Sequence, residues 1–419
     1  MVDVTGRREN STLAPHCNPP PLIVVGASGR AMAQSGFRAS IPMHAADLFR
    51  DTDLVESCVS ATRVDRYPDG IVAALRPLPA AAWCHVGGLE NRPDILDAIA
   101  AERPLAGSSA AAVRLVRDPA WLAARAREVG LAMPDTHDAA VGIPCDGSHL
   151  VKPKAGAGGR GIHRWIGAAA EDRGLVWQRW IEGVPCSAAY LAAKGRTDLF
   201  LTARQLVGWP PSRGSEFAWC GGISRRMPEA VATVVERLGW HVAAEAGLIG
   251  LFGIDFVLDD EGRVHPLEVN PRPTASMELW ERSGGGSLAA SHLAACGFAE
   301  ATPPPSAIHS KVFGKAVLFA SRQAVVPETA FDSWMRWRED WRDDDGLPAV
   351  ADIPAKGTPI PRGGPVLTVF ASGDEEHVVL ERLERRLGLV EESLLPRSAT
   401  VSRPSDAAAA SPPQGRDTP

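Results

Sequence analysis

Residues 251–273, LFGIDFVLDDEGRVHPLEVNPRP, constrain the fold most, because they predict a β-hairpin whose two faces differ in polarity. Residues 251–258 form the first predicted strand, residues 259–262 have the composition of a turn, and residues 263–270 form the return strand. One face of this hairpin is apolar and can enter a core, through Ile254, Phe256, Leu258, Leu267 and Val269.

The other face of the predicted hairpin carries oxygen ligands. A four-residue turn places Asp255 opposite Pro266, and Glu268 and Asn270 then share the face of Asp255 because side chains alternate along a strand. Like charges on one face repel each other, and a divalent cation would relieve that repulsion. Carboxylate and amide oxygens suit magnesium, and Arg272, just beyond, can hold a phosphate or carboxylate in a bidentate grip.

A glycine-rich loop lies about a hundred residues earlier. Residues 149–154 predict a short strand, residues 155–161 read AGAGGRG, and residues 162–166 predict a second strand. Glycines let bare N–H groups approach phosphates without a Cβ clash, and Lys152 and Lys154 add positive charge. No Gly-Lys-Ser/Thr ending and no helix pattern follow, so the segment predicts a flap over a nucleotide rather than a Walker A loop.

Together the two stretches resemble the ATP-grasp superfamily of ATP-dependent ligases, over roughly residues 117–297. The order is similar: a strand lysine, a glycine-rich flap, a strand that contacts adenine, and an acid-bearing hairpin that ends in Glu-x-Asn-x-Arg, here residues 268–272. The resemblance implies that Asp255, Glu268 and Asn270 hold Mg²⁺ on ATP, with Mn²⁺ as the alternative ion. It also implies an ATP-grasp architecture with a two-lobed nucleotide-binding domain.

The resemblance further implies a set of nucleotide contacts. The adenine segment corresponds to residues 176–183, and the implied contacts are Lys152, Lys154, Gly156, Gly158, Gly159, Gly161, Gln178, Trp180, Ile181 and Arg117. Two positions depart from the family pattern. The usual first phosphate lysine is absent, so Arg117 or Arg114 would take its place, and Gln178 stands where the family often has Glu.

Two further residues, Glu90 and Asn91, follow a predicted strand and its Gly87-Gly88 turn. Ligands bind at the carboxyl ends of parallel strands, so both residues are candidates for substrate contact. The alternative is structural, with Asn91 capping the helix that follows.

The expected activity is that of a ligase. A small-molecule carboxylate would become an acyl phosphate, an amine would displace the phosphate, and ADP and inorganic phosphate would be released. Lys152 would hold phosphate oxygens, and Arg272 would hold the acyl phosphate or the incoming carboxylate. A role in assembling a cofactor or an amino-acid conjugate is an extension of this expectation.

Two alternatives remain open at this stage. Residues 351–369 resemble the C-terminal domain of carboxylase-type ATP-grasp proteins, which favours an ATP-dependent carboxylase of bicarbonate, although no Met-Lys-Met biotin motif is present. The second alternative is a nucleotide-binding regulatory protein without turnover. Only the missing first lysine supports it.

Composition agrees with a large enzyme. The 419 residues carry a net charge of −6 and are 45% hydrophobic, and no basic patch of the nucleic-acid type is present. No apolar run reaches eighteen residues, and the polar first residues do not resemble a signal peptide. The seven cysteines lack CxxC spacing, which is typical of a reduced protein. We therefore expect a cytoplasmic protein with small-molecule partners and no nucleic-acid or membrane partner. Whether the chain forms a homodimer is left open.

The expected fold class combines α/β and α+β architecture. Alternating strands and helices predict an N-terminal domain with a parallel sheet, a helical linker at residues 114–129, and a long helix at residues 228–247. The expected order is a disordered segment (1–20), the α/β domain (21–113), the ATP-grasp domain (114–300, with a flap lobe at about 150–205), a C-terminal α+β domain (301–395) and a disordered tail (396–419).

Overall fold

The computed structural model describes residues 19–167, 174–300 and 311–395. The expectations of disorder at residues 1–18 and 396–419, and of a proline-rich joint after residue 300, concern residues outside these ranges.

The N-terminal region is built on a four-stranded parallel sheet in the order β3-β2-β1-β4. Its apolar strands are buried, as expected for a parallel sheet that helices cover. The strand order reverses between β1 and β4, so the loops after these two strands flank the point where α/β sheets bind ligands. The predicted parallel sheet is thus confirmed. Its elements are β1 (Leu22–Gly26), α1 (Arg30–Arg38), β2 (Met43–Asp47), α2 (Thr52–Glu56), β3 (Ser60–Arg63), α3 (Ile71–Leu75), β4 (Ala82–His85), η1 (Leu89–Asn91) and α4 (Pro93–Ala100).

The region predicted as a helical linker, residues 114–129, is helical, but it consists of two helices with a break between them. The first is α5 (Ala110–Val116) and the second is α6 (Pro119–Glu128). Pro119 lacks the N–H that a continuous helix requires, and Asp118 accepts a hydrogen bond from Ala120 N at 2.9 Å as the cap of the second helix.

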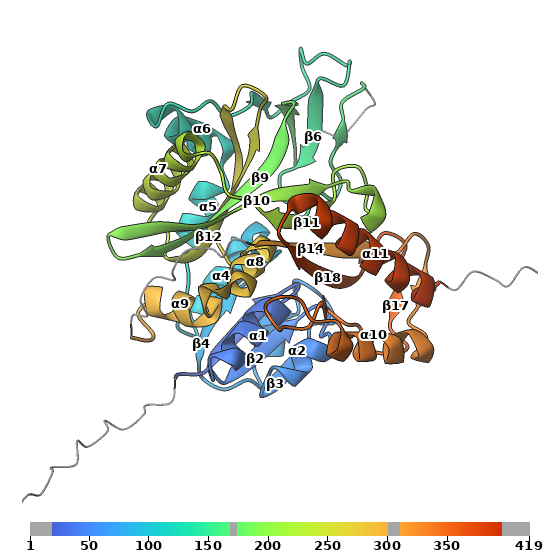
Figure 1. Cartoon of the computed structure of the whole chain (residues 1–419). Helices are drawn as coiled ribbons and strands as arrows, with labels where there is room; N and C mark the ends of the chain where they lie inside the picture. The colour runs from blue at the N-terminus through green and yellow to red at the C-terminus, as the bar shows by residue number, and fades with distance from the viewer. Residues whose placement is uncertain (1–18, 168–173, 301–310, 396–419) are drawn as a thin grey trace, which may run out of the picture.

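A mixed sheet of eight strands forms the centre of the molecule, in the order β13-β12-β9-β10-β11-β14-β18-β16. The C-terminal strands therefore continue the sheet of the preceding region (Figure 1). The strands are β9 (Val184–Ala193), β10 (Arg196–Val207), β11 (Trp219–Ser224), β12 (Gly250–Leu258), β13 (Val264–Asn270), β14 (Val312–Phe319), β16 (Val350–Ala351) and β18 (Pro365–Gly373).

Helices cover both faces of the central sheet. On one face, α7 (Glu229–Ala246) packs Val235 and Leu238 against Tyr190 of β9, and α11 (Glu376–Leu394) packs on β14 and β18. On the other face, α8 (Glu278–Trp280) and α9 (Leu288–Ala295) share a core with the N-terminal sheet. This second face carries the candidate site. The shorter connecting elements are η2 (Pro210–Ser212), η3 (Ala275–Met277), η4 (Glu281–Gly285), α10 (Glu328–Asp340) and the pair β15 (Ala324–Val325) and β17 (Pro359–Ile360).

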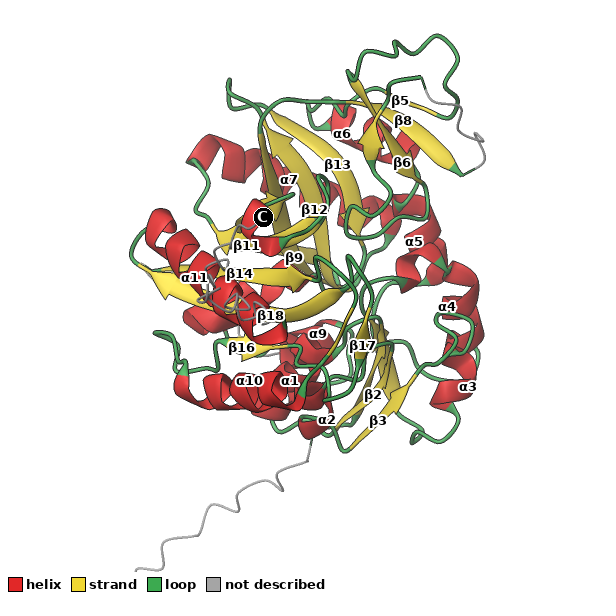
Figure 2. Ribbon diagram, turned by 90° about the vertical axis from the view of Figure 1, so that its right-hand side faces the viewer, coloured by secondary structure: helices red, strands yellow, loops and turns green. Residues whose placement is uncertain are grey.

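A separate four-stranded sheet forms the flap lobe, in the order β5-β8-β6-β7. Its strands are β5 (Thr136–His137), β6 (His149–Pro153), β7 (His163–Arg164) and β8 (Leu175–Arg179). A small core that includes Val151, Trp165 and Trp177 holds the lobe together. Figure 2 shows the lobe projecting beyond the central sheet, at the end of the molecule opposite β2 and β3.

Candidate active site

The acidic face of the β12–β13 hairpin is present, but the strand pairing that produces it differs from the predicted pairing. The register pairs Phe256 with Pro266, one residue away from the expected pairing of Asp255 with Pro266. A bulge follows between Asp255 and Phe256, and Asp255 then pairs directly with Glu268. Leu267 is partly exposed rather than part of the core. Without the bulge, Glu268 would lie on the opposite face from Asp255.

The connection between β12 and β13 is longer than the predicted four-residue turn, and local hydrogen bonds explain the difference. Asp259 accepts hydrogen bonds from the backbone N–H groups of Glu261 and Arg263, at 3.1 and 2.8 Å, and its second oxygen accepts from Arg263 Nε at 2.7 Å. These bonds hold Arg263 in the connection, so the return strand begins at Val264.

Asp255 is held between two carboxamides. Gln205 of β10 donates to Asp255 Oδ1 at 2.8 Å, and Asn270 donates to Oδ2 at 3.0 Å. Burial raises the pKa of Asp255 to about 7, and the charge of Glu268 adds to this effect. A cation at this place would remove both the repulsion and the shift. No motif surrounds Gln205 in the sequence, and only the pairing of β10 with β9 and of β9 with β12 brings it here.

Glu268 differs from Asp255 because cations surround it. Crowding by the protein acts against its ionisation, but Arg117 and Lys152 hold the pKa of Glu268 below its usual value. Its side chain is 43% exposed. Two carboxylates with separated pKa values therefore face each other beside a source of positive charge.

Arg117, just after α5, supplies part of this charge. Its guanidinium donates to Glu268 Oε2 at 3.0 Å and to Asn91 Oδ1 at 3.2 Å. Arg114 instead forms an exposed ion pair with Asp97 at 2.6 Å. Of the two arginines left open by the sequence, Arg117 is the one that the structure places beside the acidic hairpin.

Lys152 of β6 approaches the same acids from the flap lobe. Its Nζ donates to Gln178 Oε1 at 2.9 Å, and Gln178 Nε2 donates to Thr136 Oγ1 at 3.0 Å. Burial lowers the pKa of Lys152, while the charges of Glu268 and Asp255 oppose that shift. Lys154 is exposed and pairs with Asp138 at 2.8 Å. Strand alternation puts both lysines on one face, but only Lys152 lies among the candidate residues.

We expect Lys152→Met to raise the KM for ATP by about 10- to 100-fold, since a hydrogen bond to a charged group contributes roughly 1.5–3 kcal/mol. Lys154→Met serves as the matched control and should change it by less than about threefold, because exposed ion pairs contribute little. ATP titrations of the two variants measure the difference. A larger loss in Lys154→Met would reverse the assignment.

The glycine loop lies against two other parts of the chain. Gly156 O accepts from Asn91 Nδ2 at 3.1 Å, and Gly158 O accepts from Trp219 N at 3.0 Å. Gly159 has φ +77°, and a Cβ there would lie 1.7 Å from Phe217 O. Gly161 likewise has a positive φ of +80°. Only glycine fits this close approach of the loop to Phe217 and Trp219.

The expected adenine segment runs from the end of β8. The Arg164 guanidinium lies 4.7 Å from the centre of the Trp180 ring, and the Phe217 ring packs edge-on at 5.9 Å. Trp180 N donates to Ser148 O at 2.8 Å. Ile181 N has no hydrogen-bond partner among the described residues. Its N–H is therefore available to a ring nitrogen of a bound base.

Arg272 links the hairpin to the N-terminal region. Its Nη2 donates to Glu90 Oε1 at 2.6 Å and to Asn270 Oδ1 at 3.3 Å. Burial acts against the ionisation of Glu90, but Arg272 holds the pKa of Glu90 down at about 2. The sequence did not predict this ion pair. Asn91 contacts Arg117 and Gly156, and it lies in η1 rather than at the cap of α4.

Comparisons with known proteins agree with this geometry. Residues 120–276 match the model of a family described as an ATP-grasp domain. No curated protein matches the sequence.

Several solved structures share the fold. Carboxyaminoimidazole ribonucleotide synthase from Aspergillus clavatus, complexed with ATP, is 16% identical with a TM-score of 0.66, and the match covers 90% of this chain and 99% of that one. L-amino acid ligase from Bacillus licheniformis is 14% identical with a TM-score of 0.62, covering 88% and 97%. Biotin carboxylase from Campylobacter jejuni is 13% identical with a TM-score of 0.60, covering 87% and 90%.

At these identities the structures establish the fold, and the family match establishes the domain. The predicted fold class is confirmed. The chain therefore contains an ATP-grasp domain, at residues 120–276.

Proposed function

We propose that this protein is an ATP-dependent ligase that converts a small-molecule carboxylate into an acyl phosphate and transfers the acyl group to an amine. The observation that carries the proposal is the pairing of Asp255 with Glu268, with Arg117 beside them and Lys152 coupled to the same charges. This arrangement suits the transfer of a terminal phosphoryl group, which needs positioning and charge stabilisation more than covalent chemistry from the protein.

ATP and Mg²⁺ are the proposed cosubstrate and cofactor. Neighbours with this fold have been crystallised with ATP and with a magnesium salt of ADP. In this chain Asp255, Glu268 and Asn270 would hold the ion, and Mn²⁺ accepts the same hard oxygen ligands. The raised pKa of Asp255 supports the fit, since it reflects a repulsion that a cation removes. When bound, Mg²⁺ would offset charge on the terminal phosphates.

The residues of the chain would divide the remaining work. Arg117, Lys152 and the N–H groups of the glycine loop would hold phosphate oxygens. Gln178, Trp180 and Ile181 would bind the adenine. Lys154, being exposed, would contribute charge at the rim. A lowered loop would exclude water, which would otherwise hydrolyse an acyl phosphate.

Arg272 is the proposed contact for the acyl group. It lies beside Asn270 and opposite the N-terminal turn at Gly87, where an added Cβ would lie 3.6 Å from the guanidinium carbon of Arg272. A planar guanidinium at the junction of two regions is suited to a carboxylate or acyl phosphate. Glu90 would fix its orientation.

Bicarbonate is the alternative acyl donor. Two neighbours, the ribonucleotide synthase and biotin carboxylase, bear names that denote carboxylation, whereas the L-amino acid ligase joins amino acids. Bicarbonate-dependent ADP release would favour the carboxylase, and ATP binding without ADP release across many acceptors would favour a regulatory protein.

No helix in the described ranges is long and apolar enough to cross a membrane.

We expect turnover to release ADP and inorganic phosphate, with ¹⁸O moving from a labelled carboxylate into the phosphate. The experiment screens pooled carboxylates and amines for ADP release and identifies products by mass spectrometry. Arg272→Lys, which keeps a charge for the buried Glu90, should bind ATP normally but form about tenfold less product, because a weaker grip costs roughly 1–2 kcal/mol. Stoichiometric AMP would overturn the proposal.

A further inference from the structure

We propose that a cavity between α1, η4 and the start of β14 binds a small-molecule carboxylate that carries an apolar group. The cavity lies outside the proposed reaction centre, and the inference does not depend on the ligase function. It follows from the residues that line the cavity, from their hydrogen bonds and from their balance of charge.

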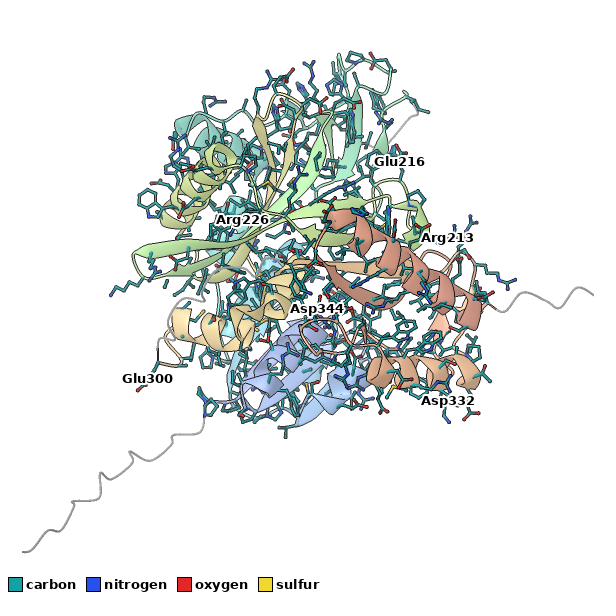
Figure 3. The ribbon with its side chains drawn as sticks, viewed as in Figure 1. Arg213, Glu216, Arg226, Glu300, Asp332 and Asp344 are labelled. Atoms are coloured by element: carbon teal, nitrogen blue, oxygen red, sulfur yellow. The ribbon has the colours of Figure 1, made fainter. Side chains whose placement is uncertain are left out.

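The cavity has a volume of about 630 Å³, which is within the range of small-molecule sites. Its walls come from the end of α1, from η4 and the residues that lead into α9, from the start of β14 and from the loop before β16. Asp344, labelled in Figure 3, belongs to the wall that this loop forms. The cavity is therefore built by segments from both the N-terminal and the C-terminal parts of the chain.

The helix α1 separates the cavity from the proposed reaction centre. Arg30 begins this helix at the turn after β1, and Arg38, its last residue, lines the cavity. Nine helical residues span about 12 Å. None of the residues proposed to bind ATP, Mg²⁺ or the acyl group lines the cavity. It is thus a second site rather than an extension of the first.

Three cationic side chains and three carboxylates line the cavity, and each cation is paired with one acid at an N···O distance of 2.8–2.9 Å. The pairs are Arg38 with Glu281, Arg282 with Asp345, and Lys311 with Asp344. Because the two signs are equal in number, the lining has a net charge near zero. A ligand with a single charge therefore suits it better than a phosphate dianion.

The carboxylates have little capacity left to bind a ligand. Glu281 accepts from its arginine through Oε1 and from the backbone N–H of Leu288 through Oε2, at 2.8 and 3.4 Å. Asp345 accepts from its arginine and from the backbone N–H of Leu347, at 2.9 and 2.8 Å. Asp344 accepts from a lysine and a serine through one oxygen, Oδ2. Five of the six carboxylate oxygens are thus engaged, which disfavours an ammonium ligand.

The cations, by contrast, keep donors that no acceptor in the described ranges uses. Arg38 binds Glu281 through Nε and Nη2, which leaves Nη1. Lys311 has three donors but only one carboxylate at 2.9 Å, since the next, on Asp374, is 4.0 Å away. Arg282 is only 6% exposed, and its Nε has no partner among the described residues. Because a buried donor without an acceptor is costly, the lining calls for acceptor atoms, which an anion supplies.

The anion would be held by side chains rather than by the helix end at the cavity. The first three N–H groups of α9 already donate, to the side chains of Glu281, Ser35 and Ser287. Phosphate groups bind to free N–H groups at such helix ends, and these three are not free. Guanidinium and ammonium donors remain, and they suit a carboxylate.

The cavity also has an apolar part. Phe313 and Leu347 line it, and an added Cβ at Gly286 would meet nothing within 4 Å. An apolar group of the ligand would displace water from these two side chains. The lining therefore suits a carboxylate on an aromatic or aliphatic body, and phenylacetate is a simple probe of this kind.

Calorimetric titration with phenylacetate near neutral pH, without ATP, tests the inference. We expect one site per chain with a Kd of about 1 mM or lower, the range that the small size of the probe allows. Neutral 2-phenylethanol and cationic 2-phenylethylamine carry the same ring and should bind at least about tenfold more weakly, because they offer no anionic acceptor. Absence of phenylacetate binding up to about 20 mM would overturn the inference.

Two substitutions locate the bound probe. Lys311→Gln should weaken phenylacetate binding about fivefold or more, because an ammonium donor at the cavity is lost. Its matched control is Lys356→Gln, since Lys356 is also an exposed lysine paired with one acid, at 2.8 Å, but does not line the cavity. Leu347→Trp should fill the cavity and abolish detectable binding. Leu347 is partly exposed and keeps its backbone N–H for Asp345, so the thermal unfolding temperature should change little.

The Arg272→Lys variant distinguishes this site from the proposed reaction centre. We expect it to bind phenylacetate as wild type does, since Arg272 does not line the cavity. Equal affinities in wild type, Lys311→Gln and Leu347→Trp would overturn the inference. A loss of binding in Arg272→Lys but not in Lys311→Gln would also overturn it, because the probe would then occupy the reaction centre.

Discussion

Glu268→Gln should lower the kcat for ADP release by about 100- to 1,000-fold, the loss typical of removing one transition-state stabiliser. Asp255 faces Glu268 directly across the hairpin, and Arg117 contacts the Glu268 carboxylate. Replacing one carboxylate by an amide leaves a cation with a single charged ligand while the shape is kept. The side chain is 43% exposed, so the fold should be retained.

The measurement combines ADP release at saturating Mg²⁺ with thermal unfolding. Glu261→Gln is the matched control because Glu261 lies in the turn of the same hairpin, is exposed, and pairs only with Arg263. The control should retain wild-type kcat. Near wild-type activity of Glu268→Gln would reject Glu268 as a ligand of the nucleotide-bound cation.

Gly159→Val should lower kcat by about 100-fold, because misplacing a closing element by about 1 Å has effects of this size. Gly159 has φ +77°, which a β-branched residue avoids, and its Cβ would lie 1.7 Å from Phe217 O. The obstacle is backbone, so the glycine loop would have to lift from residues 217–219. Water would then reach the acyl phosphate.

Gly158→Ala separates this effect from simple strain. Gly158 also has a positive φ, +61°, but nothing lies within 4 Å of the added Cβ. We expect less than about a threefold change in kcat for Gly158→Ala. For Gly159→Val we expect the slower turnover to be uncoupled, so that a larger fraction of the released ADP is formed without product. Equal effects of the two substitutions would show that strain, rather than contact of the lowered loop, limits turnover.

Local sequence patterns predicted several of the strands and helices. The buried parallel strands, the helix α7 and the flap strands around the glycine loop follow from local periodicity and turn composition. The expectation that Asp255 and Glu268 share a face was also confirmed. However, it held for a different reason, because a shifted register and a bulge cancel each other. The broken helix at Pro119 was readable in principle and was missed.

Other features depend on contacts between distant segments. Strand alternation could not rank Lys152 above Lys154, and helix periodicity could not choose Arg117 over Arg114. The structure places Lys152 and Arg117 beside Glu268 because the flap lobe and α5 pack around the hairpin. The pairing of Arg272 with Glu90 joins residues that are 182 positions apart.

The amino-acid sequence by itself determined which residue types were available for phosphate, metal and acyl chemistry, and in which order along the chain. The tertiary structure decided which of them meet. Side-chain alternation and helical periodicity act over a few residues, so a short stretch of sequence is enough to specify them. The strand register and the bulge depend on how whole elements pack, and no short stretch of sequence encodes that outcome.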